Sequence, residues 1–329
     1  MLKVSTNPHM QTTRDTKSLM LDVVIALMPA AIAALLFFGV DALRVILTSV
    51  ASCVMFEYLA CRYWLKNGNT TTDYSAVITG LLLAYNLPST MPCWMILIGA
   101  FVAIILAKIC FGGLGCNIFN PALVGRVFLF ISFPVQMTVW PKPYFLKMFS
   151  PDGETGATTL RMIKSIGKTA DSSQAMYVLE DLPEYWEMFV GNTGGCIGEI
   201  SALALLLGFA YLMWRRVISW HIPVMFIGTV LLLTSVLYWT TGNAKFLPLA
   251  HIFSGGLMLG AIFMATDYTT SPMTVKGQVI FAVLCGILTV IIRSFSAYPE
   301  GISFAILIMN AFVPLIDKFA VQRYFGEKK

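Results

Sequence analysis

The stretch Leu19–Gly39, LMLDVVIALMPAAIAALLFFG, decides the class of fold. It holds 21 residues, of which only Asp22 is charged. A helix needs about 20 mainly apolar residues to cross the hydrocarbon core of a bilayer. The stretch therefore predicts a membrane-spanning helix.

The composition of the whole chain supports this interpretation. Of its 329 residues 57% are hydrophobic and 12% charged, and the mean hydropathy is +0.77. Soluble domains carry about 25% charged residues, so this chain has too little polar surface for a water-soluble globule. The net charge of +5 is not concentrated in a basic patch, which argues against a nucleic-acid partner and leaves the lipid bilayer as the expected surroundings.

Further apolar runs predict an all-α, polytopic membrane protein with about ten transmembrane helices. The remaining runs of spanning length are Leu43–Leu65, Cys93–Cys110, Thr193–Trp214, Trp220–Thr240, Gly277–Ile292 and Ile302–Phe319. Shorter or glycine-interrupted runs are Ser75–Leu87, Ala122–Phe133 and Leu247–Ala265.

Loop charges orient these spans. Lys and Arg are enriched in short cytoplasmic loops, and the bias places both termini in the cytoplasm. We expect the membrane to be the cytoplasmic (inner) membrane of a bacterium. We expect a first membrane half at 1–133, an extracytoplasmic insertion at 134–191, a second half at 192–320 and a cytoplasmic tail at 321–329. Five helices in each half imply inverted topology, a plan typical of proteins with a binding site near the midplane.

Three segments are candidates for function: Asp152–Leu160, Phe111–Phe128 and Ser254–Pro272. Thr155-Gly156-Ala157-Thr158 combines small residues with a hydroxyl that they leave with little steric cover, although a helix start capped by Thr158 or Thr159 explains the same pattern. Asn120-Pro121 is typical of a helix N-terminus.

Three more side chains in these segments are harder to explain by local structure. Arg126 lies within an apolar helix and needs a partner or an aqueous cavity. Asn117 stands in the glycine-rich loop before that helix, and Asp267 ends an apolar run as either a functional group or a cap.

Together these segments resemble one family, the D subunits of Rnf-type ferredoxin:NAD oxidoreductases and the related B subunits of sodium-pumping NADH:quinone oxidoreductases. Thr155–Thr158 matches the family's Ser/Thr-Gly-Ala-Thr signature, Asn120–Arg126 its Asn-Pro-Ala-x-x-Gly-Arg segment, and Gly255–Pro272 its GGLxxGAxFMATDxxTSP pattern. Tyr268 stands where that pattern often has Pro. The resemblance extends over essentially the whole chain.

The resemblance implies an electron carrier within a redox-driven Na⁺ or H⁺ pump, inactive alone, with a fold similar to that of urea transporters. FMN would be linked by a phosphoester to Thr158, and a second flavin, riboflavin, could be present. The partners would be the other Rnf subunits, of the A, B, C, E and G types. Residues expected at the cofactor are Thr155, Gly156, Ala157, Thr158, Asn117, Asn120, Arg126, Asp267 and Thr269; no catalytic or metal-binding residue is expected.

Three alternatives stay open on the residues alone. A solute channel or secondary transporter would share the inverted plan without a flavin, and a scaffold protein would leave Thr158 chemically bare. The equivalent chain of the quinone-reducing enzyme would carry the same motifs in a different complex. No NAD-binding GxGxxG follows a strand, and no cysteine spacing fits an iron–sulfur cluster.

Overall fold

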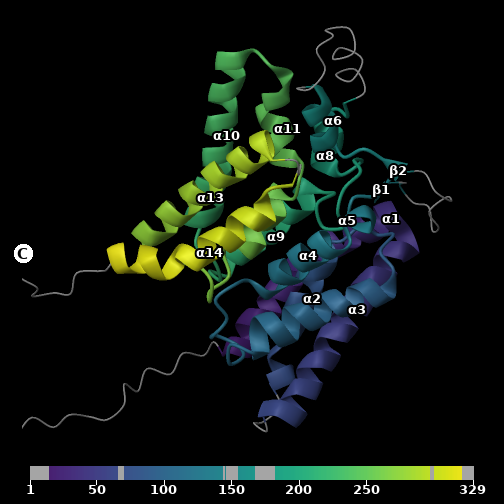
Figure 1. The fold of residues 1–329 in the computed structure, drawn as a ribbon, viewed down its shortest axis with the longest axis vertical. Coiled ribbons are helices and arrows are strands. Elements are labelled where there is room, and N and C mark those ends of the chain that lie inside the picture. Colours follow the sequence, from purple (N-terminus) through teal and green to yellow (C-terminus); the bar gives the residue numbers. More distant parts are fainter. Residues whose placement is uncertain are drawn as a thin grey trace, which may run out of the picture.

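A computed structural model describes residues 15–65, 70–143, 145, 155–166, 182–296 and 300–320. The predicted tail 321–329 and much of the predicted insertion lie outside these residues. Apart from one two-stranded pair, the regular secondary structure of the described residues is helical (Figure 1).

The first helix is too long to be a single straight crossing. Helix α1 runs over Thr16–Ala60 and begins where the Asp15 carboxylate accepts a hydrogen bond from the backbone N–H of Thr16. Its 45 residues would span roughly 68 Å at 1.5 Å per residue, about twice the hydrocarbon core. Gly39, with φ 59° and ψ −138°, breaks the helix between the two predicted spans, because this backbone conformation is accessible mainly to glycine.

The first set of helices comprises α1 and the elements up to residue 132. After α1 come a π-helical turn, η1 (Cys61–Leu65), the 3-10 helix η2 (Thr70–Asp73) and the short helix α2 (Ser75–Tyr85). Helix α3 (Cys93–Phe101) continues as the π-helix η3 (Val102–Ile109), and α4 (Pro121–Ser132) closes the set.

The second set runs from α9 to α14. It contains α9 (Ala202–Trp214), α10 (His221–Thr241), η4 (Ala244–Phe246), α11 (Pro248–Phe253), α12 (Leu257–Leu259), the π-helix η5 (Gly260–Met264), α13 (Val275–Phe295) and α14 (Ile302–Phe319). The predicted span Leu247–Ala265 is thus a broken element, because Gly255 and Gly256 both adopt positive φ angles, +72° and +67°.

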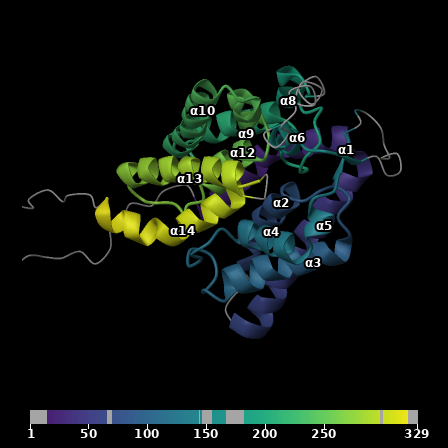
Figure 2. The same cartoon turned by 45° about the horizontal axis from the view of Figure 1, so that its top comes forward.

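The described elements between the two sets lie on the right-hand side in Figure 1, and Figure 2 shows the same elements after rotation. It contains α5 (Pro134–Met137), β1 (Trp140–Pro141), β2 (Thr155–Gly156), α6 (Thr159–Ile166) and α8 (Tyr185–Val190). The strands pair antiparallel with Trp140 opposite Gly156, so the first residues of the Thr155–Thr158 motif are held in a two-residue ladder.

One predicted span differs from the structure. The apolar run Thr193–Trp214 becomes helical only at Ala202. The residues before it pack as irregular chain against the end of α2, where Ile197 and Gly198 donate backbone hydrogen bonds to the carbonyls of Leu87 and Tyr85 at 3.1 and 2.9 Å. Apolarity therefore predicted the burial of this segment correctly, but not its conformation.

The two sets share one continuous hydrophobic core. Small residues allow close approach: a Cβ on Gly208 of α9 would overlap the Ala26 carbonyl of α1. Large apolar side chains also cover the outside, among them Leu47, Leu232 and Trp239, and four helical segments are long and apolar enough to cross a bilayer. The chain is therefore a multi-pass helical membrane protein.

Candidate functional site

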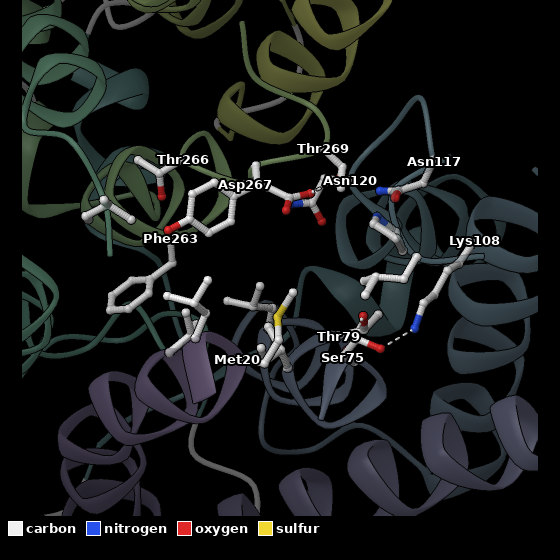
Figure 3. Close-up of a pocket in the computed structure, with 18 of the residues that line it drawn as sticks. Met20, Ser75, Thr79, Lys108, Asn117, Asn120, Phe263, Thr266, Asp267 and Thr269 are labelled. Atoms are coloured by element: carbon white, nitrogen blue, oxygen red, sulfur yellow. Dashed lines mark hydrogen bonds between the residues drawn. The ribbon is translucent and has the colours of Figure 1, made fainter. Parts of the chain in front are cut away.

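A cavity of about 90 Å³ lies between the two helix sets. Its polar lining includes four residues predicted from sequence, Asn117, Asn120, Asp267 and Thr269. They come from the loop before α4 and the loop after η5, and Figure 3 shows them along one edge of the cavity. The rest of the lining is mixed: Met20 of α1 and Phe263 of η5 are apolar, whereas Ser75, Thr79 and Lys108 are polar. The cavity therefore suits a ligand that combines hydrogen-bonding groups with apolar surface.

The polar edge is held by contacts across the two sets. The Asn120 side chain caps α4 by accepting from the Ala122 N–H at 3.1 Å, and its amide donates to the Met264 carbonyl at 3.2 Å. The predicted N-cap is confirmed, and Asn120 additionally joins the two sets.

Asp267 is both a local hydrogen-bond acceptor and a cavity residue. Its Oδ2 accepts from the hydroxyls of Thr269 and Thr270 at 2.9 and 3.3 Å. Burial raises the pKa of Asp267, while these hydrogen bonds lower it. A carboxylate partly withdrawn from water beside a cavity can bind a cation or a proton.

A buried ion pair borders the same cavity. Lys108, at the end of η3, donates to Glu57 Oε2 at 2.8 Å and to Ser75 Oγ at 2.7 Å, the latter drawn in Figure 3. Lys108 is only 3% exposed, and Glu57 of α1 neutralises it.

Arg126 lies at the centre of the interface between the sets. Its guanidinium pairs with Glu300, which precedes α14, and donates to Asn86 Oδ1 at 2.9 Å and to Ser303 Oγ at 2.6 Å. The partner that an arginine in an apolar helix requires is therefore a carboxylate 174 residues away.

A second buried charge group lies next to this pair. Glu199 Oε1 accepts from the Gly255 N–H, and Arg293 Nη2 donates to the carbonyls of Ser254 and Gly255 at 3.1 and 3.2 Å. Ligand atoms of Cys196, Glu199 and Glu300 lie within 4.8 Å of one another. Arg126 and Arg293 already balance the two carboxylates, so the donor set does not require a metal ion.

The Thr155–Thr158 motif lies away from the cavity, and none of its residues lines it. Thr158 precedes α6, and its Oγ1 accepts from the Arg161 N–H at 3.3 Å, the pattern of an N-cap. The expectation of a hydroxyl with little steric cover is wrong: Thr158 is 5% exposed, because α6 packs against η4 and α11.

The predicted residues thus fall into three places. Asn117, Asn120, Asp267 and Thr269 meet at one cavity, Arg126 lies at the set interface, and Thr155–Thr158 stand at the start of α6. Sequence reasoning missed the buried charges that complete these sites: Glu57, Lys108, Glu199, Arg293 and Glu300. A charged residue within or beside an apolar run is the sequence signal that could have identified them. The rule that orients spans by their loop charges instead counts such residues as part of a loop.

The cavity and the central charges are connected. Asn86 accepts from Arg126 and donates to the Leu82 carbonyl at 2.6 Å, and Leu82 lines the cavity. Asn86 also contacts Met264, to which Asn120 is bonded. Asn120 and Asn86 thus both contact Met264, Asn120 at its carbonyl and Asn86 at its sulfur, and Asn86 in turn contacts Arg126.

Comparison with known proteins identifies relatives over almost the whole chain. The sequence model of the NQR2, RnfD, RnfE family matches residues 3–326. The D subunit of the proton-translocating ferredoxin:NAD(+) oxidoreductase complex of Clostridium ljungdahlii is 44% identical over 328 residues, covering 99% of this chain and 96% of the relative.

Two further relatives agree. The D subunit of the Na(+)-translocating ferredoxin:NAD(+) oxidoreductase complex of Acetobacterium woodii is 43% identical over 330 residues, covering 100% of this chain and 96% of the relative. The D subunit of the ion-translocating oxidoreductase complex of Salmonella paratyphi B is 38% identical over 354 residues and covers 99% of both chains. With a match across residues 3–326 and these identities, the chain belongs to the NQR2, RnfD, RnfE family.

Proposed function

We propose that the chain is the D-type membrane component of an ion-translocating ferredoxin:NAD⁺ oxidoreductase, an electron-transferring translocase that acts only as a complex. The observation that carries this proposal is the identity of 43–44% over the full chain to two proteins named for that function. One of them is named for protons and the other for Na⁺, so the proposal covers either ion.

Within this function, FMN is covalently attached at Thr158. The hydroxyl stands at the N-terminus of an eight-residue helix, where backbone N–H groups and the helix dipole favour a phosphate group. Gly156 and Ala157 add little bulk beside it, and Thr155 is fixed by strand pairing. When bound, the flavin supplies the electron-carrying chemistry, while the protein supplies position and electrostatics.

The cavity lined by Asn117, Asn120, Asp267 and Thr269 is the candidate place for a second, noncovalent flavin such as riboflavin. Its polar edge offers amide, hydroxyl and carboxylate partners, and Met20 and Phe263 add apolar surface. That combination suits the hydrogen-bonding edge of a flat ring system.

The proposed arrangement is ten crossings in two inverted halves, 1–133 and 192–320, similar to urea transporters, with 134–191 outside and both termini inside. The cavity residues come from loops that the charge bias assigns to the cytoplasm, and the start of α6 belongs to the insertion assigned to the opposite side. The complex would lie in the bacterial cytoplasmic membrane with partner subunits of the A, B, C, E and G types.

The flavin assignment is tested on a denaturing gel. The complex is produced together with a flavin transferase, and the chain is examined for flavin fluorescence alongside the Thr158→Ala and Thr159→Ala variants. We expect fluorescence in the wild type and Thr159→Ala and none in Thr158→Ala. A dark wild-type band, or a fluorescent Thr158→Ala band, would contradict the assignment.

A further inference from the structure

We propose that Lys245 and Arg293, with Lys164, form a binding site for a phosphate group, and that its occupant is the phosphodiester of the flavin on Thr158. This inference rests on the proposed function for the identity of the occupant. A phospholipid headgroup carries the same chemical group, a singly charged phosphodiester, so it is the other source of phosphate that the experiment must distinguish.

The site is a small cavity between α6 and the second helix set. Its volume of about 10 Å³ has room for one water-sized group, which matches a single unesterified phosphoryl oxygen. Lys164, Lys245, His251 and Arg293 line it together with Leu160 and Phe246, and no carboxylate does so among the described residues.

The Arg293 guanidinium is held by hydrogen bonds, but one of its N–H donors has no acceptor among the described residues. It is 4% exposed and donates to the carbonyls of His251, Ser254 and Gly255. Its Nε has no hydrogen-bond partner among the described residues. A buried donor without an acceptor is costly, and an anionic oxygen in the cavity that Arg293 lines would provide one.

His251 does not supply the missing negative charge. Its Nε2 lies 2.9 Å from the Lys245 carbonyl, and its Nδ1 lies 3.5 Å from Arg293 Nη1. Since a carbonyl only accepts and a guanidinium only donates, Nε2 carries the proton and Nδ1 accepts. The imidazole is therefore neutral.

In the first helix set, a cation at the position that corresponds to Arg293 is neutralised by a carboxylate. Lys108 ends the helix that follows the short α2, and Arg293 stands in the last turn of the helix that follows the broken element α11–η5. Lys108 pairs with Glu57 near the end of α1. Helix α10, which precedes the broken element, ends in Tyr238-Trp239-Thr240-Thr241 and offers no carboxylate.

Among the described residues, the carboxylates that act on Arg293 do not compensate the whole cluster. Glu199 and Glu300 act on Arg293, but both also act on Arg126, so these four charges balance. Lys245 is then an additional positive charge: its Nζ donates to the Ser294 carbonyl at 3.0 Å. Lys164 donates to the Ser296 carbonyl from the other side of the cavity.

Thr158 is attached to the element that closes this cavity. Leu160, two residues after Thr158, and Lys164 both belong to α6 and line the cavity. Leu160 packs directly against Gly255, where a Cβ would overlap its Cδ1 and come within 2.6 Å of Arg293 Nη2. A phosphate on Thr158 would thus be placed at the N-terminus of the helix that carries part of the basic site.

The experiment separates the phosphate site from covalent attachment by using Thr158→Ala as background. The full chain is titrated with FMN and with riboflavin, which lacks the phosphate, and binding is followed by flavin fluorescence. We expect FMN to bind about tenfold or more tightly than riboflavin, as a hydrogen bond to a charged group would give. Adding Lys245→Gln should bring the ratio of FMN affinity to riboflavin affinity close to one. Lys245→Arg should largely preserve that ratio.

Arg161→Gln in the same background is the matched control, because Arg161 is an exposed cation on α6 outside the cavity. An FMN affinity that Lys245→Gln leaves unchanged, or equal effects of Lys245→Gln and Arg161→Gln on that affinity, would overturn the phosphate site. A dark wild-type chain on the denaturing gel would instead overturn the covalent flavin of the proposed function, and the effect of Lys245→Gln on FMN affinity would still decide the phosphate site.

Mass spectrometry of co-purified lipid distinguishes the two sources of phosphate. Anionic phospholipid retained by the Thr158→Ala chain, displaced by Lys245→Gln but not by FMN, would reassign the site to a lipid headgroup and overturn its assignment to the flavin. Release of that lipid by FMN, or no retained lipid together with the FMN preference, would support the flavin phosphate.

Discussion

At the scale of single residues, this protein buries charged side chains, which costs free energy, and neutralises them with partners distant in sequence. Arg126 and Glu300 are both nearly inaccessible, at 6% and 8% exposure. Removing one member of a buried pair leaves the other uncompensated, at a cost of about 3–5 kcal/mol. The pair joins α4 to the start of α14, so the same charges that need burial also fix how the two helix sets meet.

We expect Glu300→Gln to lower the melting temperature of the detergent-purified chain by several degrees, because Arg126 would lose its counter-ion. The double variant Glu300→Gln/Arg126→Met should recover part of the loss, since no charge is then left buried. Glu184→Gln, an exposed carboxylate in the same chain, serves as control and should leave the melting temperature unchanged. Additive losses in the double variant would contradict a direct interaction.

Asp267→Asn should reduce ion uptake by vesicles containing the assembled complex at least about tenfold, equivalent to about 1.4 kcal/mol of lost interaction with the charge. Asn keeps the shape of the side chain and can still accept from Thr269, so only the negative charge at the cavity disappears. Asp41→Asn, at an exposed pair with Arg44, is the control. Normal ion uptake by the Asp267→Asn complex would show that Asp267 acts only as a local hydrogen-bond acceptor.

At the scale of elements, the breaks in the helices determine which polar groups reach the interior. The turn at Gly255 and Gly256 exposes backbone groups to Arg293 and Glu199 that a continuous helix would have bonded internally. π-Helical turns at η3 and η5 stand beside the cavity that Lys108 and Phe263 line. Such turns are frequent at functional sites, because they interrupt the regular hydrogen bonding of a helix.

Gly255→Ala tests whether this break positions α6. A Cβ there would collide with Leu160 and approach Arg293, so we expect a clear fall in covalent flavin content and in melting temperature. Gly242→Ala is the matched control: its φ of +63° is equally left-handed, but nothing lies within 4 Å of the added Cβ. It should cost only about 1 kcal/mol of backbone strain. Equal effects of the two substitutions would show that strain alone, and not the contact with α6, matters.

At the scale of the whole molecule, the polar sites lie at different ends of the helix sets. The cavity draws on the start of α1, the loop before α4 and the loop after η5, whereas the basic cluster draws on α6, η4 and the end of α13. A membrane electron carrier requires such separation if it connects reactions on the two faces of a bilayer. The buried contacts from Asn120 through Met264 and Asn86 to Arg126 span the region between the helix sets.

The proposed topology places these ends on opposite sides of the membrane. In a background in which the exposed Cys93, Cys110 and Cys116 are replaced, single cysteines are introduced at Glu184 and Lys276, both exposed. An impermeant thiol reagent applied to intact cells should label Glu184→Cys and spare Lys276→Cys, which should react only after the cells are opened. The reverse pattern would invert the orientation.

Much of this architecture could be predicted from sequence because the relevant physics is local. Apolar runs long enough for a bilayer indicated the helices, and every predicted span contains helical residues of the structure. Asn120-Pro121 predicted the start of α4. Four residues of the motif segments line one cavity, which the sequence alone did not predict. Hydropathy failed at residues 193–201, because burial against α2 satisfies backbone groups there without a helix.

By itself, the sequence determined that this protein is helical, resides in a membrane and belongs to a family of redox-driven ion pumps, since each conclusion depends on composition or on short contiguous motifs. Only the tertiary structure decided which charges neutralise one another. Arg126 finds Glu300 across 174 residues, Lys108 finds Glu57 across 51, and Arg293 and Lys245 converge with Lys164 around a cavity. No local pattern encodes these partnerships, because buried charges are matched by the packing of distant helices and not by their order in the chain.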